Sequence, residues 1–421
     1  MAKYLVNKSG PLIGEVEISG SKNAVLPILA ASILSSGQCE ILDVPALRDV
    51  EVMCQLLSSL GVSLEIDYTQ NKIVIESTNI ENTEAPFELV KKMRASFLVM
   101  APLLAKTGHS RITLPGGCAI GARPIDLHLK GFAALGAKVT VGDGYVEARA
   151  EKLVGSTIYL DFPSVGATES IIMAASLAEG HTVLENAAME PEIVDLANFL
   201  NKMGAKIKGA GTNTIKIDGV TTLHGAKHNV IPDRVETATF MIAAAITRGD
   251  LLIKNVVSDH VKPIIAKLIE CGAEVIDADE GIRVRADRKE LISTDIKTLP
   301  YPGFPTDMQS QFMALLTTVN GKSVVIETVF ENRFMHVKEL SFMGADIKIE
   351  GRSAVVTGGK KLKGCRVIAT DLRAGAALVL AGLTTEGVTE ISEIYHIERG
   401  YSDFVEKLTK IGATITRVED L

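Results

Sequence analysis

A short motif recurs six times along the chain, and this repetition is the strongest constraint on its fold. In each copy a helix-like run ends on a triplet centred on glycine, and a short alternating strand follows. Glycine fits this place because it adopts the left-handed conformation that ends a helix without strain. The triplets, about 70 residues apart, are Leu60-Gly61-Val62, Leu135-Gly136-Ala137, Met203-Gly204-Ala205, Cys271-Gly272-Ala273, Met343-Gly344-Ala345 and Ile411-Gly412-Ala413.

An earlier helix rich in small residues precedes each triplet, and most of these helices lead through a turn into a strand. Such helices are apolar nearly all round, which predicts that they are buried. Each unit then has about two helices and four strands, and six units predict an α/β protein of two domains with three units each. We expect one domain at residues 1–20 and 233–421 and the other at 21–232. The six helices are Ala24–Leu34, Ala95–Ala105, Thr168–Ala178, Thr237–Thr247, Met308–Thr318 and Arg373–Leu383.

Composition excludes several classes of protein. The net charge of -7 argues against a general surface for nucleic acid, so an anion site must be a local cluster of Arg and Lys. Five cysteines without Cys/His ligand spacing argue against a disulfide framework and a structural zinc. Apolar runs stay below about 18 residues and the start of the chain does not have the pattern of a signal peptide. We therefore expect a cytosolic protein with no membrane span.

One glycine-rich stretch, residues 114–128, combines a thiol (Cys118), a guanidinium (Arg123) and a carboxylate (Asp126). Its glycines and two prolines predict a loop rather than a helix or strand. Loops that close over substrates often have this composition. The alternative is a glycine-rich turn with an inert, buried cysteine, because free cysteines are commonly small core residues.

Charged residues recur at the starts of the small-residue helices, where free N–H groups and the helix dipole favour anions. Any one of them has a simpler reading, as a solvated surface charge or, for Asp307, as a helix cap. Equivalent positions of a repeated unit converge on one face, however, and several cations together predict an anionic ligand. These residues are Lys22, Arg94, Arg234, Asp307 and Arg373, with Arg123, Arg333 and Arg399 in turns.

Over essentially its whole length the chain resembles the UDP-N-acetylglucosamine 1-carboxyvinyltransferases of the enolpyruvyl transferase family. The resemblance rests on Gly20-Ser21-Lys22-Asn23-Ala24, on Pro115 to Pro124 (PGGCAIGARP), on Phe304-Pro305-Thr306-Asp307-Met308-Gln309, on Glu331-Asn332-Arg333-Phe334-Met335-His336 and on Ala369-Thr370-Asp371-Leu372-Arg373-Ala374. It implies a two-domain inside-out α/β barrel of six repeats, joined by a double crossover, with the site in the cleft. The implied reaction transfers the enolpyruvyl group of phosphoenolpyruvate to the 3-hydroxyl of UDP-N-acetylglucosamine by addition and elimination, with release of phosphate, as the first committed step of peptidoglycan biosynthesis.

The resemblance also implies roles for individual residues. Cys118, Asp307, Lys22 and Arg399 match catalytic positions, with Asp307 taking a proton from the sugar hydroxyl and Cys118 moving a proton at the enolpyruvyl carbons. Phosphoenolpyruvate would contact Lys22, Asn23, Arg123, Arg333, Arg373 and Arg399. UDP-N-acetylglucosamine would contact Asn23, Arg94, Arg123, Pro124, Ile125, Asp126, Leu127, Ser164, Val165, Gly166, Asp307 and Val329. Phe162 stands where relatives can carry Lys, and Arg48 matches a basic position often filled by Lys.

The same resemblance implies no cofactor and no metal, a cytoplasmic enzyme with these two small molecules as partners, and alkylation of Cys118 by the epoxide phosphonate fosfomycin. Two alternatives stay open. The related transferase that acts on shikimate 3-phosphate shares the repeats and the cationic set but does not have the Cys118 loop. A non-catalytic paralogue that binds a nucleotide sugar would be expected to have lost Asp307, Lys22 or Arg399, and all three are present.

Overall fold

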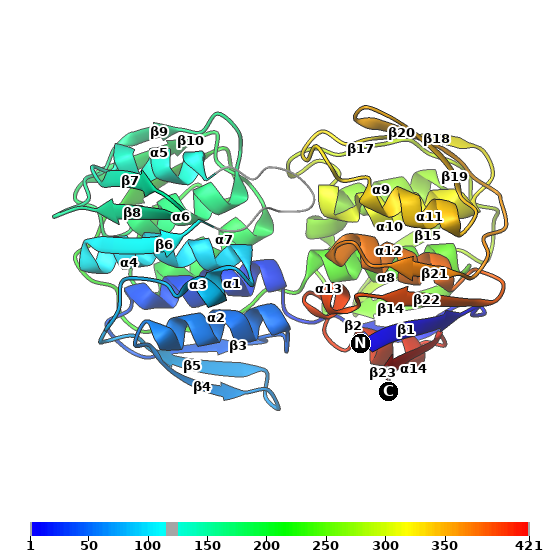
Figure 1. Ribbon diagram of the computed structural model, residues 1–421, viewed down its shortest axis with the longest axis horizontal. Helices are drawn as coiled ribbons and strands as arrows, with labels where there is room; N and C mark the ends of the chain where they lie inside the picture. The colour runs from blue at the N-terminus through cyan, green and yellow to red at the C-terminus, as the bar shows by residue number, and fades with distance from the viewer. Residues whose placement is uncertain (1, 115–124, 420–421) are drawn as a thin grey trace. The chain divides into compact units, whose positions relative to one another are not determined.

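The computed structural model describes residues 2–114 and 125–419. These residues form two compact units, each with its own hydrophobic core. The terminal unit holds residues 2–19 and 232–419, and the inserted unit holds residues 20–114 and 125–231. Figure 1 shows the first two strands and the last helix together in the terminal unit.

The described strands of the terminal unit form three sheets of four strands each. In each sheet one parallel pair adjoins antiparallel neighbours, as where β14 runs parallel to β2 and antiparallel to β16. The N-terminal strands β1 and β2 therefore complete sheets built from the C-terminal half. In spatial order the sheets are β15 (Glu274–Ala278), β16 (Gly281–Arg285), β14 (Asp250–Lys254) and β2 (Ile13–Glu17); β17 (Ile296–Lys297), β18 (Lys322–Ile326), β20 (Ser353–Thr357) and β19 (Asp346–Glu350); and β21 (Arg366–Ile368), β22 (Val388–Ser392), β1 (Ala2–Asn7) and β23 (Thr414–Glu419).

The described strands of the inserted unit form two sheets of four strands and one of three. In the second repeat a single bridge between Glu84 and Arg111 stands where the other repeats have a fourth strand. The segment that contains Glu84 is rich in Asn, Thr and Glu and runs up to Pro86, a composition that disfavours a strand. The sheets are β13 (Lys227–Asn229), β3 (Cys39–Leu42), β5 (Lys72–Glu76) and β4 (Ser63–Asp67); β11 (Lys206–Lys208), β12 (Thr214–Asp218), β10 (His181–Glu185) and β9 (Thr157–Tyr159); and β6 (His109–Thr113), β8 (Tyr145–Arg149) and β7 (Lys138–Gly142).

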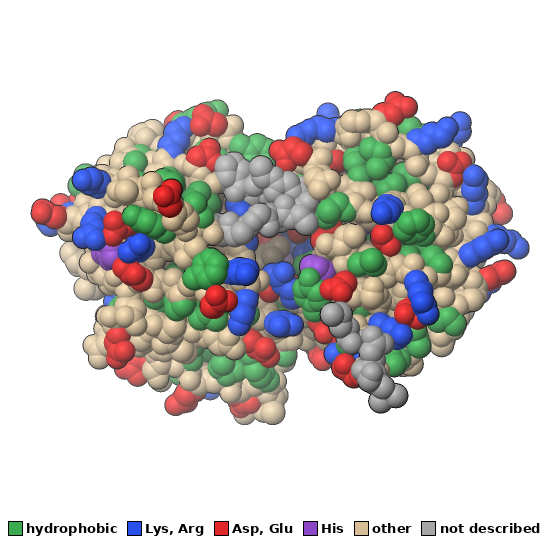
Figure 2. Space-filling view, viewed as in Figure 1, with side chains coloured by type: hydrophobic (Ala, Val, Ile, Leu, Met, Phe, Trp, Pro, Cys, Tyr) green, Lys and Arg blue, Asp and Glu red, His purple; other side chains and the backbone are tan. Residues whose placement is uncertain are grey.

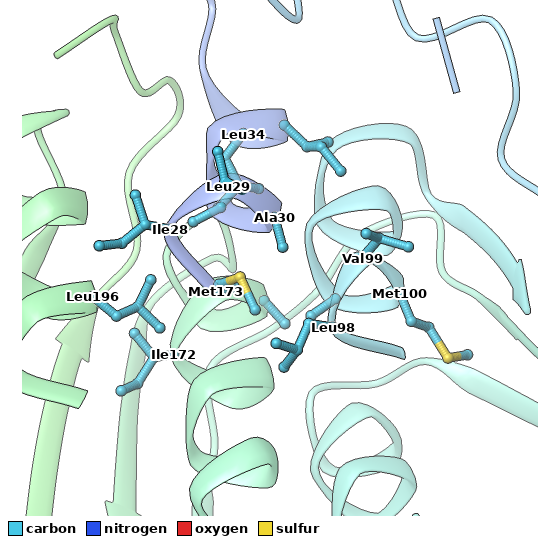
Figure 3. Packing of buried hydrophobic residues seen from close by; sticks show 14 of the residues in the cluster. Ile28, Leu29, Ala30, Leu34, Leu98, Val99, Met100, Ile172, Met173 and Leu196 are labelled. Atoms are coloured by element: carbon cyan, nitrogen blue, oxygen red, sulfur yellow. The ribbon is translucent and has the colours of Figure 1, made fainter. Parts of the chain in front are cut away.

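The small-residue helices form the centre of each unit. In the terminal unit these are α8 (Arg234–Ile246), α10 (Gln309–Thr318) and α12 (Leu372–Gly382), which pack against one another. In the inserted unit they are α1 (Lys22–Ala31), α4 (Met100–Thr107) and α6 (Val165–Ala175). Figure 3 shows α1, the start of α4 and α6 contributing apolar side chains to one cluster. The predicted burial of these helices is thus confirmed. The short 3-10 helices are η1 (Ser32–Leu34), η2 (Arg94–Val99), η3 (Ser258–Val261) and η4 (Thr306–Met308).

The outer helices confirm the predicted glycine caps. All six triplet glycines have φ between +93° and +106°. In each copy the N–H group of the residue after glycine donates to a carbonyl five residues earlier, as Ala413 donates to Leu408. This is the Schellman bond that closes a helix end. The outer helices are α2 (Arg48–Ser59), α5 (Asp126–Ala134), α7 (Pro191–Lys202), α9 (Lys262–Glu270), α11 (Met335–Phe342) and α14 (Phe404–Lys410), with two shorter helices, α3 (Phe87–Val90) and α13 (Tyr395–Glu398).

These elements confirm the mixed α/β class. Buried helices lie inside each unit and half-buried sheets surround them, as the inside-out description implies, but the described strands form separate sheets that do not close into a barrel. Figure 2 shows Lys and Arg side chains interspersed with Asp and Glu over the visible surface. In the described residues, the longest apolar helices fall short of what crossing a membrane requires.

Candidate active-site residues

The three central helices of the terminal unit begin close together and bring charged side chains with them. Asp233 caps α8 by accepting from the N–H groups of Val235 and Glu236 at 2.8 and 2.9 Å. Asp371 caps α12 in the same way, accepting from Arg373 N at 2.8 Å. Asp307 lies in η4, the turn that opens α10. The aspartates at these helix starts therefore have different partners, and Asp307 is not the cap that the simpler reading assigned.

Asp307 forms ion pairs with two arginines, Arg333 in the turn before α11 and Arg373 in the first turn of α12. Arg333 Nη2 lies 2.7 Å from Asp307 Oδ1, and Arg373 Nη2 lies 3.3 Å from Oδ2. We call these three residues the Asp307 cluster. Burial alone would raise the pKa of Asp307, but the charges of Arg373 and Arg333, with Arg234 nearby, hold that pKa well below its usual range. The carboxylate is therefore ionised at neutral pH.

Both arginines of the cluster are buried, with side chains 6% exposed, whereas Asp307 is 26% exposed. Arg333 also donates to Thr306 Oγ1 at 3.3 Å and lies 5.2 Å from the centre of the Phe330 ring. Aromatic faces and fixed hydrogen bonds hold a guanidinium in one orientation. Two planar, oriented guanidinium groups are suited to bind a carboxylate in a bidentate manner.

The loop after β18 is fixed by one buried carboxylate, Glu327. Its Oε1 accepts from Thr298 Oγ1 and from the N–H of Val329, both at 2.8 Å. Its Oε2 accepts from Thr306 Oγ1 at 2.9 Å. Glu327 thereby connects the Val329 backbone to the turn that carries Asp307. Nothing in the sequence pattern distinguishes this glutamate, and we did not predict it.

Arg399 ends the short helix α13 and is partly buried. Burial lowers the pKa of the neighbouring His396 and the charge of Arg399 lowers it further, whereas Asp371 opposes the shift. Gly400, the residue after Arg399, lies against Leu372 at the start of α12, since an added Cβ there would be 2.7 Å from Leu372 Cδ2.

In the inserted unit, Lys22 is the first residue of α1, and its helix is capped by Ser21, whose Oγ accepts from Ala24 N at 3.3 Å. Lys22 Nζ lies 2.7 Å from Asp49 Oδ2, and the Asp49 side chain is only 3% exposed. Asn23 follows on the same turn and is partly exposed. Asp49 orients the lysine, and the sequence analysis did not identify it.

The predicted nucleotide-sugar residues of this unit gather at the starts of η2, α5 and α6. His128 on α5 accepts from or donates to Ser170 on α6 at 2.9 Å, and its ring lies against Gly166, where an added Cβ would be 3.1 Å from Cε1. Burial and the charge of Arg94 lower the pKa of His128 to about 3, so the ring is neutral. The structure therefore brings Arg94, Ile125 to Leu127 and Ser164 to Gly166 near one buried histidine.

Phe162, the one departure from the family pattern, and Arg48, which matches a basic position of it, both lie at the surface. Phe162 is 43% exposed, and Arg48 is exposed at the start of α2. The adjacent Asp161 pairs with Lys130 of α5 at 2.8 Å.

Cys118, Arg123 and Pro124 lie outside the described residues. Of the other cysteines, Cys39, Cys54 and Cys271 are buried, and Cys365 is partly exposed. Burial raises the pKa of Cys54 and of Cys271 to about 12. The thiolate of these two cysteines is therefore scarce at neutral pH.

Comparison with known proteins identifies the family. Residues 6–408 match the model of EPSP synthase (3-phosphoshikimate 1-carboxyvinyltransferase). UDP-N-acetylglucosamine 1-carboxyvinyltransferase 1 of Caldanaerobacter subterraneus subsp. tengcongensis is 64% identical over 415 residues, covering 99% of each chain. The corresponding protein 2 of Carboxydothermus hydrogenoformans is 60% identical over 421 residues, covering 100% of each.

Solved structures agree with this fold. The enolpyruvyl transferase NikO of Streptomyces tendae matches with a TM-score of 0.89 and 25% identity, covering 99% of this chain and 98% of that one. An EPSP synthase of Acinetobacter baumannii, at 19% identity and a TM-score of 0.77 over 100% of both chains, shares the fold. The chain therefore belongs to the EPSP synthase family and, within it, to the UDP-N-acetylglucosamine 1-carboxyvinyltransferases, which makes it a transferase.

Proposed function

We propose that this protein transfers the enolpyruvyl group of phosphoenolpyruvate to the 3-hydroxyl of UDP-N-acetylglucosamine and releases phosphate. The observation that carries the proposal is the Asp307 cluster, in which one carboxylate is held by two buried guanidinium groups. Relatives at 64% and 60% identity are named for this activity. The reaction begins peptidoglycan synthesis, and both substrates are charged metabolites, which assigns the enzyme to the cytoplasm.

Arg333 and Arg373 hold the carboxylate of phosphoenolpyruvate in this proposal. The incoming carboxylate competes with Asp307 for the same guanidinium groups. The negative charge of the bound substrate offsets the arginine charges that depress the pKa of Asp307. The Asp307 carboxylate therefore becomes a stronger base when the substrate binds. Asp307 then accepts the proton of the sugar 3-hydroxyl while the hydroxyl oxygen forms a bond to the phosphate-bearing carbon of phosphoenolpyruvate.

Lys22, Arg123 and Arg399 hold the phosphate, with Asn23 beside Lys22. Fixed positive charges stabilise the phosphate-bearing ketal and the leaving phosphate. Asp49 keeps the Lys22 ammonium at the start of α1, because their atoms lie 2.7 Å apart in a site where Asp49 is buried.

In this proposal the nucleotide sugar is bound by residues at or just before the starts of η2, α5 and α6 and after β18. They are Arg94, Arg123, Pro124, Ile125, Asp126, Leu127, Ser164, Val165, Gly166 and Val329. The start of α6 offers N–H groups to the diphosphate, as helix N-termini do for anions. Cys118 donates a proton to the enolpyruvyl methylene carbon in the addition step. In the elimination step the Cys118 thiolate takes a proton back from that carbon, the C–O bond to phosphate breaks and the double bond returns, while protonated Asp307 gives its proton to the departing phosphate.

The test is phosphate release from phosphoenolpyruvate with each acceptor separately. We expect release with UDP-N-acetylglucosamine and background with shikimate 3-phosphate. Release with shikimate 3-phosphate alone would identify the other transferase. Tight binding of UDP-N-acetylglucosamine without any release would indicate the non-catalytic paralogue.

A further inference from the structure

A buried polar network lies beside Arg373 and joins two central helices of the terminal unit, α8 and α10, to the segment that follows α13. It consists of Thr239 on α8, Gln311 on α10 and Tyr401, which follows α13. We call it the Tyr401 network. Tyr401 is 3% exposed and the other two side chains are fully buried. Buried polar groups cost stability unless each has a partner, so the geometry of such a network is usually well defined.

The hydrogen bonds of the network have a fixed direction. Thr239 Oγ1 donates its one proton to the carbonyl of Val235 at 2.8 Å. It must therefore accept from Tyr401 Oη, which lies 3.0 Å away. Gln311 Nε2 in turn donates to Tyr401 Oη at 3.2 Å, while Gln311 Oε1 accepts from Ser310 Oγ at 2.8 Å. The Tyr401 hydroxyl thus donates to Thr239 and accepts from Gln311, and the Arg373 side chain also hydrogen-bonds to it.

The Tyr401 network also contacts Arg373 through the Tyr401 ring. The guanidinium carbon of Arg373 lies 5.5 Å from the centre of the Tyr401 ring. The Tyr401 ring also packs against the Phe404 ring, with 4.7 Å between the two centroids. We propose that Tyr401 is a positioning residue, which fixes the plane of the Arg373 guanidinium so that it meets the carboxylate of phosphoenolpyruvate in a bidentate manner. Burial raises the pKa of Tyr401 against the opposing charge of Arg373, which keeps the hydroxyl protonated as the network requires.

This inference rests on the proposed function, and Tyr401→Phe tests it. The substitution keeps the aromatic ring beside Arg373 and removes the hydroxyl, with its hydrogen bonds to Thr239, Gln311 and Arg373. We expect kcat/KM for phosphoenolpyruvate to fall about tenfold, because small misplacements of a positioning group cost that much or more. KM for UDP-N-acetylglucosamine should change less than twofold. The matched control is Tyr4→Phe, which removes a buried hydroxyl in the same unit, bonded at 3.3 Å to Glu398 and outside the network.

A double-mutant cycle with Arg373→Lys separates positioning from general stability. If Tyr401 acts through the guanidinium plane, Tyr401→Phe should have less than a twofold effect when lysine replaces Arg373. An equal tenfold loss in both backgrounds, or full wild-type kinetics in Tyr401→Phe, would overturn the inference. Absence of phosphate release in the wild type and in Tyr4→Phe would instead count against the proposed function.

Discussion

At the scale of single residues, the two arginines of the Asp307 cluster have opposing effects. They are suited to bind an anionic ligand, and they make Asp307 a weaker base. A carboxylate held by two buried arginines is strongly anionic and therefore a weak base. The same arginines are the groups that a carboxylate substrate needs. In the proposed mechanism the substrate and Asp307 therefore compete for the same guanidinium groups, and substrate binding makes Asp307 a stronger base. A surface aspartate would not have this dependence.

Asp307→Asn should separate the two effects. We expect kcat to fall by about 10² or more, since a general base contributes on this order. Phosphoenolpyruvate should bind the variant at least as tightly as the wild type, because the arginines no longer have a competing anion. Steady-state kinetics and equilibrium binding of phosphoenolpyruvate measure both quantities. Weaker binding together with unchanged kcat would contradict this account.

Asp307 also affects the response to acid. Because its pKa is lower in the folded chain than in the unfolded chain, its stabilising contribution is present above about pH 4, the usual value for an unfolded aspartate. That contribution is lost as the pH falls from there toward the depressed folded value. Acid titration of the wild type should show this loss, and Asp307→Asn should not show this part of it.

The cysteines offer a second test at this scale. Cys39, Cys54 and Cys271 are buried, and burial raises the pKa of each thiol. Burial also raises the pKa of Cys365, which is partly exposed.

We expect fosfomycin to modify Cys118 alone, and faster when UDP-N-acetylglucosamine is present. Peptide mass mapping measures the site. Cys118→Asp should escape modification and keep turnover, because a carboxyl group can donate a proton but is a poor nucleophile toward the epoxide. Modification of any of the other four would show that Cys118 is not the reactive thiol.

At the scale of elements, Lys106 joins the first two repeats of the inserted unit. It lies in the last turn of α4, and its ammonium donates to the carbonyl oxygens of Ile33, Ser35 and Ser77 at 2.7, 2.7 and 2.6 Å. Ile33 and Ser35 lie at the end of η1, and Ser77 follows β5. Carbonyls at the ends of such elements need donors from outside the element. One lysine therefore satisfies three acceptors from two segments of another repeat.

Lys106→Met should destabilise the protein by about 3 kcal/mol, since it leaves partly buried carbonyls without a charged donor. Loss should appear as a lower midpoint of denaturant unfolding. Lys138→Met on β7, where the lysine is exposed, is the matched control and should be nearly neutral. Equal midpoints for the two variants would show that the three hydrogen bonds contribute little.

At the scale of the whole molecule, the described chain passes from one unit to the other at Ser19–Gly20 and at Ile231–Pro232. Asp233 N donates to Ser19 O at 2.9 Å and Ser21 N donates to Ile231 O at 2.7 Å, so the two passing segments are paired with each other. Lys407 of α14 holds this pair on the terminal side, with Nζ 2.6 Å from both Ser19 Oγ and Glu236 Oε1.

Glycine is required at one of these passages. A Cβ added at Gly20 would lie 1.8 Å from the carbonyl oxygen of Asp43, which is backbone and cannot rotate away. Gly20→Ala should therefore lower the free energy of unfolding by about 1–3 kcal/mol, the usual cost of overpacking. Gly10→Ala, where nothing lies within 4 Å, is the control. Calorimetric midpoints measure the difference. Equal midpoints would mean that the passage adjusts at no cost.

Local sequence patterns specify the repeated unit, the buried helices and their glycine caps, because apolar periodicity and left-handed glycine depend on neighbouring residues. They also indicate which helix starts carry charge. Long-range packing brings Asp307 to Arg333 and Arg373, Asp49 to Lys22, and Glu327 to Thr306, and it places His128 against Gly166. These contacts join residues far apart in the chain, often from different repeats, and no local pattern encodes them. The single bridge in place of a fourth strand in the second repeat is of the same kind, since strand pairing depends on both partners.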